Sequence, residues 1–174
     1  GSSGGGHLRG LMLALLFFSA YVTPGRGRVR EREGSADLVI GGSAADPSAV
    51  FLGKSLVVWQ TQVIGTVFFV PAFHVLLSGS LPADPGIILK EIGILALSAV
   101  SLASLGVLLA RISDGNRLRD ILLPLILLPA SLPVFILAAD AMNLEADAGT
   151  GAASAGALGL AGMAYAAAGS FLYP

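Results

Sequence analysis

Long apolar runs dominate this sequence of 174 residues and restrict what it can fold into. A helix of roughly 20 residues crosses a hydrocarbon layer about 30 Å thick. Four runs have about that length, and a shorter, strongly apolar run precedes them. We therefore predict membrane-spanning segments at residues 8–22, 55–77, 87–110, 121–139 and 152–172.

The composition supports a membrane protein and excludes several other classes. Hydrophobic residues make up 55% of the chain and charged residues 12%, whereas a soluble domain has about 25% charge. The mean hydropathy is +0.83. A net charge of -1 argues against a nucleic-acid partner, which requires a basic face. The absence of cysteine excludes disulfides and thiolate sites, and two histidines are too few for a histidine-rich metal site.

The expected fold is an all-α, polytopic transmembrane bundle, because backbone groups in lipid must be hydrogen-bonded within their own segment. No run shows the alternation of apolar and polar residues that is typical of strands in a membrane β-barrel. Pro124, Pro129 and Pro133 predict a kinked fourth span that packs against neighbouring helices. Small residues at three- or four-residue steps in the last span predict close helix packing. We expect one domain over residues 8–172, after a linker or cloning remnant at residues 1–7.

The distribution of basic residues predicts the orientation, because cytoplasmic segments retain Lys and Arg. Residues 24–54 contain five of the ten basic residues, and residues 111–120 contain three. Residues 78–86 contain none, and residues 140–151 contain only acids as charged groups. The N-terminus is therefore expected outside and the C-terminus in the cytoplasm. A signal peptide is the alternative for the first run, but no cleavage site followed by a soluble domain supports it.

Few residues have side chains that suit catalysis, proton transfer or ligand binding. His74 is either a proton relay or haem ligand, or an interfacial histidine that touches water, and we favour the second interpretation. For Lys90 and Glu91 we favour side chains that extend to the lipid head groups over a pair that lines an outer cavity. No nucleophile or acid–base set indicates an enzyme. An interfacial aromatic residue and two polar residues facing other helices are expected at the inner end of the second span: Trp59, Gln60 and Gln62.

The most informative polar segment is residues 24–54, between the first two spans. It begins with mixed charges, continues with a short amphipathic stretch at residues 37–40 and turns at two glycines. It re-enters the membrane after Asp46, Pro47, Phe51, Gly53 and Lys54. A solvated charge run is the simplest interpretation of the arginines alone. The helix–turn element behind them suits docking to a soluble partner instead.

Two stretches resemble known permeases. EREGSADLVIGG followed by FLGK resembles the coupling helix of ABC-2-type permeases, and RLRDILLPLILLPASLPVFILAA resembles the haem exporter protein B (CcmB) family of cytochrome c maturation. The likeness extends from Leu8 to Leu172. It departs from the family in offering five spans of an expected six, for which the simplest account is a missing first helix. Ser35, Ala36 and Asp37 also replace a bulkier acidic-aliphatic run.

The resemblance implies a non-catalytic permease subunit in the bacterial inner membrane, surrounded by lipid bilayer. Its expected partners are a CcmA-like ATP-binding subunit, which carries the ATP, and other haem-handling membrane proteins. No cofactor is expected on the chain itself, and haem is the transported or handled ligand, with His74 as its candidate contact. Two alternatives remain: a generic ABC-2 exporter of a lipid, drug or polysaccharide, and a non-transporting structural subunit. The residues implied to couple to the ATPase are Arg30, Glu31, Arg32, Glu33, Gly34, Asp37, Arg117 and Arg119.

Overall fold

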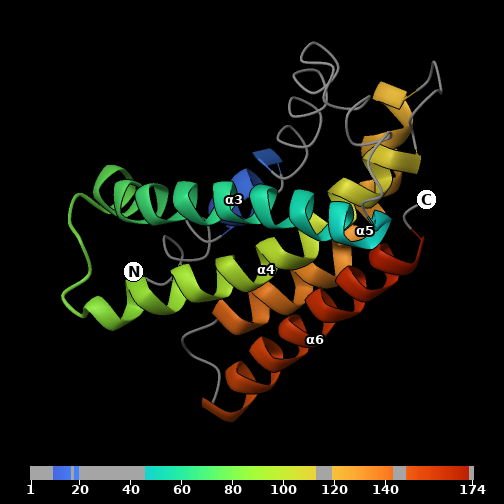
Figure 1. Cartoon of the computed structure of the whole chain (residues 1–174). Helices are drawn as coiled ribbons and strands as arrows, with labels where there is room; N and C mark the ends of the chain where they lie inside the picture. The colour runs from blue at the N-terminus through green and yellow to red at the C-terminus, as the bar shows by residue number, and fades with distance from the viewer. Residues whose placement is uncertain (1–9, 17, 20–45, 113–118, 143–147, 173–174) are drawn as a thin grey trace.

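In the part of the chain that the computed structural model describes, helices joined by short connections are the regular secondary structure (Figure 1). The described residues are 10–16, 18–19, 46–112, 119–142 and 148–172. The first two ranges are a short N-terminal helical segment. The long helices are α3 (Pro47–Ser78), α4 (Pro85–Ile112), α5 (Arg119–Met142) and α6 (Ala148–Leu172). The all-α prediction is confirmed.

Helix α3 begins at Pro47 rather than at residue 55 because a capping arrangement precedes the apolar run. The Asp46 carboxylate accepts a hydrogen bond from the Ser48 N–H at 3.0 Å, and a proline at the first position loses no helical hydrogen bond. At the other end, Gly79 has a φ of 73° and donates its N–H to the Val75 carbonyl. Glycine reaches this left-handed conformation without steric cost, so the helix ends there.

Helices α3 and α4 form an antiparallel hairpin. The Asp84 carboxylate accepts a hydrogen bond from the Gly86 N–H at 2.8 Å and so caps the start of α4. Phe51, near the start of α3, and Val107, near the end of α4, belong to one buried cluster. One end of the bundle therefore holds the start of α3 and the end of α4. The two basic segments predicted to be cytoplasmic adjoin this same end.

Helix α4 is the centre of the bundle and lies between α3 and α6 (Figure 1). In the most apolar stretch of α4, 67% of the residues are buried inside the protein, against 17% in the corresponding stretch of α6. Large apolar side chains point outward on the long helices, including Phe68, Leu76, Leu89 and Phe171. A helix that is apolar on all sides suits a lipid environment.

Among the described residues, four helices are long and apolar enough to cross a membrane. They correspond to the second to fifth predicted spans, so these predictions agree with the structure. The first run is helical at residues 10–16 and 18–19. Its remaining residues lie outside the described part, and its crossing of the membrane stays a prediction.

Helix α5 contacts α6 between two of its own prolines. The helix continues through Pro129 and Pro133, each of which lacks a backbone donor. The Tyr165 hydroxyl of α6 donates to the Ala130 carbonyl, between these prolines, at 3.3 Å. The predicted packing of this helix against its neighbours is thus observed.

Small residues allow α6 to approach α3 and α4 closely. A Cβ added to Gly162 would lie 3.2 Å from the Ser101 Oγ of α4. A Cβ added to Gly169 would lie 2.6 Å from Phe51 Cε1, which is below van der Waals contact. The predicted close approach is therefore observed at Gly162 and Gly169, whereas a Cβ at Gly156 or Gly159 would meet nothing within 4 Å.

Candidate functional site

A histidine of α3 and a glutamate of α4 meet inside the bundle. The His74 Nε2 lies 2.8 Å from the Glu91 Oε2, and the two groups share a hydrogen bond. The side chains are only 11% and 2% exposed. Ionisable groups within a membrane helix are costly unless they are paired, so this contact offsets part of their burial. The pair joins the two helices close to the loop that connects them.

The pair fixes the relative position of two helices, because the shared hydrogen bond joins a side chain of α3 to one of α4. It is not part of a larger ligand set, since the described residues contain no group of three His, Cys, Asp or Glu able to hold a metal. Histidine is a common haem ligand. The Nε2 of His74 is engaged with Glu91, however, so a haem contact through that atom requires the bond to break.

The expectations for the two residues that form this pair were wrong in one respect. His74 was interpreted as an interfacial residue that touches water, and Glu91 as a side chain that reaches the head groups, but both are buried. Lys90 is exposed, as expected. Successive residues on a helix are separated by about 100°, so Lys90 faces outward while Glu91 faces α3.

A signal for this pairing was present in the sequence. In an antiparallel hairpin, residues at similar distances from the turn lie side by side. His74 precedes the capping Gly79 by five residues, and Glu91 follows Asp84 by seven. Two ionisable residues so placed in consecutive spans indicate a partner for each other, because neither is stable alone in an apolar interior.

Most residues predicted to contact the ATPase lie outside the described part of the structure. Arg119 is the first residue of α5. Residues 47–54, the last part of the predicted coupling segment, form the first turns of α3. The other predicted coupling residues lie outside the described ranges: Arg30, Glu31, Arg32, Glu33, Gly34, Asp37 and Arg117.

The polar residues expected at the inner end of the second span differ in environment. The Trp59 Nε1 donates to the Ala96 carbonyl of α4 at 3.0 Å, so this side chain links two helices. Gln60 is exposed, whereas Gln62 is 2% exposed. The amide nitrogen and oxygen of Gln62 have no hydrogen-bond partner among the described residues. The expectation of polar residues facing other helices therefore holds for Gln62 and not for Gln60.

The helices and their apolar outer surface define the class: a multi-pass helical membrane protein. The family model described as CcmB protein matches residues 10–170. The chain belongs to the CcmB family, whose members are haem-exporter membrane permeases of cytochrome c maturation. Comparisons with curated proteins and with solved structures gave no match.

Proposed function

We propose that this chain is the membrane subunit that couples ATP hydrolysis by a separate subunit to the movement or release of haem or of haem-loaded chaperone. Its family and the four span-capable helices in the described part of the chain support a permease role. The observation that carries the coupling is the early start of α3 at Pro47, within the predicted coupling segment. The segment proposed to receive the force thus continues directly into a membrane helix.

Packing at the start of α3 supports transmission of force into the bundle. Phe51 is fully buried and belongs to one cluster with Val58, Ala103 and Val107 of α3 and α4. Its ring also adjoins Gly169 near the end of α6. A displacement of this first turn must move α4 and α6 or break a close-packed contact, because protein interiors transmit strain.

The proposed partners are a CcmA-like ATP-binding subunit and other haem-handling membrane proteins. The ATP-binding subunit would contact the residues around Arg32 and Glu33, so catalysis of ATP hydrolysis belongs to that partner chain. Haem would be a handled ligand rather than a resident cofactor. A role for His74 in contacting it would require release of Glu91.

Co-purification tests the assignment of the docking segment. We expect Arg32→Glu and Glu33→Arg to reduce recovery of the ATP-binding subunit from detergent-solubilised membranes. Lys90→Glu is the matched control, since Lys90 is exposed near the start of α4, at the opposite end of the hairpin. Equal recovery with all variants would contradict docking at this segment. Recovery of an ATPase without haem-handling proteins would favour a generic ABC-2 exporter, and recovery of neither would favour a structural subunit.

The proposed location is the bacterial inner membrane, with the basic segments in the cytoplasm. A tag beside Glu145 should react with an impermeant reagent from outside, and a tag beside Gly115 should react only after the membrane is opened. The reverse labelling would refute the orientation derived from the basic residues.

A further inference from the structure

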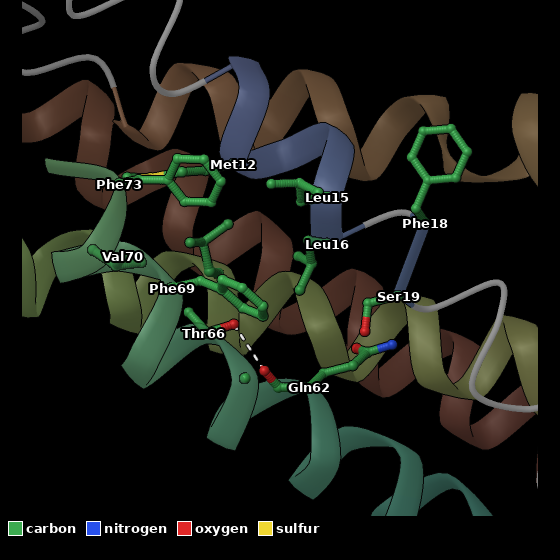
Figure 2. A pocket seen from close by; sticks show the side chains of 12 residues that line it. Met12, Leu15, Leu16, Phe18, Ser19, Gln62, Thr66, Phe69, Val70 and Phe73 are labelled. Carbon is green, nitrogen blue, oxygen red and sulfur yellow. Dashed lines mark hydrogen bonds between the residues drawn. The ribbon is translucent and has the colours of Figure 1, made fainter. Parts of the chain in front are cut away.

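A cavity of about 290 Å³ lies between the N-terminal helical segment and α3. Its walls are mainly apolar, and Figure 2 shows Met12 and Leu16 on one side and Phe69, Val70 and Phe73 on the other. It exceeds the ~150 Å³ of an engineered apolar cavity that stays dry and binds benzene. A cavity with such walls favours an apolar occupant.

One buried polar side chain gives this cavity a specific chemistry. Gln62 of α3 lines it with an amide that has no hydrogen-bond partner among the described residues. In Figure 2 this amide lies at one end of the pocket, beside the Ser19 side chain. The nearby Thr66 hydroxyl already donates to the Gln62 backbone carbonyl at 2.8 Å. Because an unpaired buried amide is destabilising by about 1–3 kcal/mol, its presence indicates a partner supplied from elsewhere.

The exposed rings of the lining show how an occupant would enter. Phe18 and Phe69 both line the cavity, and they are 62% and 61% exposed. On a protein whose outer surface is apolar, such side chains face lipid tails rather than water. The cavity is therefore reached from the lipid.

We propose that this cavity binds a membrane lipid with one alkyl chain and an un-ionised hydroxyl head group, such as a long-chain alcohol or a monoacylglycerol. The hydroxyl both donates and accepts, which matches the oxygen and nitrogen of the Gln62 amide. No charged residue is found among the described lining residues, so an ionised head group has no counter-charge there. A lone water is a poorer occupant, because a buried water typically makes about three hydrogen bonds.

Photo-crosslinking of the whole protein in nanodiscs tests this proposal. The probe is a long-chain alcohol that carries a diazirine, and the crosslinked residues are read by mass spectrometry. We expect labels on the cavity-lining residues of α3 and of the N-terminal segment. Gln62→Leu should lower this labelling by about three- to tenfold, the effect of one lost hydrogen bond. Gln60→Leu is the matched control, because it changes an exposed glutamine of the same helix.

A second probe and a second variant distinguish recognition of the head group from binding of the alkyl chain in the cavity. The corresponding alkane probe, which lacks the hydroxyl, should label the wild-type protein as weakly as the alcohol labels the Gln62→Leu variant. Gly65→Leu places a side chain in the cavity from the lining of α3 and should abolish labelling while Gln62 remains. Mass spectrometry of co-purified lipids then distinguishes a free alcohol from a monoacylglycerol as the natural source.

Several results would overturn the proposal. Equal labelling of the wild-type protein and Gln62→Leu would show that the amide does not bind the head group. Equal labelling by the alcohol and the alkane would remove the hydroxyl from the argument. Labels confined to outward residues such as Leu76, or no label in the cavity, would show that lipid does not occupy it.

Discussion

Substitutions that remove the hydrogen bond between His74 and Glu91 provide the most direct test of how the hairpin of α3 and α4 is stabilised. We consider His74→Ala, Glu91→Ala and the double variant. The Nε2–Oε2 distance of 2.8 Å and the 2% exposure of the glutamate side chain indicate a short, desolvated contact. Either single substitution removes this hydrogen bond but leaves the other polar group buried. The double substitution removes both groups and leaves no orphaned partner.

The expected magnitude follows from the hydrogen bond and the burial of the pair. Neutral hydrogen bonds between membrane helices contribute about 0.6 kcal/mol on average, whereas bonds to charged groups contribute about 1.5–3 kcal/mol. We therefore expect a coupling free energy of about 0.6–3 kcal/mol between the two positions. The double variant should lose less stability than the sum of the single losses by that amount.

Reversible unfolding in mixed micelles, followed by circular dichroism, measures the four free energies of unfolding. Lys90→Ala serves as the control, because this exposed neighbour of Glu91 should change stability by no more than about 0.5 kcal/mol. If the stability loss of the double variant equals the sum of the two single losses within about 0.5 kcal/mol, the two side chains are independent. That result would refute the pair as a link between the helices.

Substitutions at two glycines and one tryptophan test the packing of α3 and α6. Gly169→Ala should destabilise by about 1–3 kcal/mol, because the added methyl overlaps the buried ring of Phe51. A Cβ added at Gly156 meets nothing within 4 Å, so Gly156→Ala should raise stability by up to about 1 kcal/mol through helix propensity. A higher unfolding midpoint for Gly169→Ala than for Gly156→Ala would contradict this packing. Trp59→Phe loses the bond to the Ala96 carbonyl and should lower the free energy of unfolding by about 0.6 kcal/mol, and an unchanged value would show that the bond contributes nothing.

The sequence was sufficient for the helical class and for the approximate positions of the four long apolar helices among the described residues, because lipid permits few alternatives. Helix starts were less predictable, since hydropathy locates the apolar run rather than the cap before it. Asp46 and Pro47 place the start of α3 well ahead of residue 55. The capping pattern was present in the sequence, but the apolar run alone did not reveal it.

The buried polar residues were harder to predict because they depend on helix rotation. Glu91 and Lys90 are adjacent in sequence, and which of them faces α3 is decided by packing. The same holds for Gln60 and Gln62, of which only the second is buried. Hydropathy treats the members of each pair alike. A prediction of contact requires the face that each residue occupies, and tertiary packing sets that face.

Helix α3 is longer than a bilayer crossing requires, and a proline lies near its end. Its 32 residues correspond to about 48 Å at ~1.5 Å per residue, more than the ~30 Å needed to cross the hydrocarbon core. Pro71 interrupts its hydrogen bonding three residues before His74, and helices bend preferentially at proline. Under the proposed function, force received near Pro47 would therefore pass into α4 and α6 through the packing of Phe51, and α3 would bend at Pro71. The last turns would stay fixed to α4 through Glu91, so the buried pair would act as the anchor for that movement.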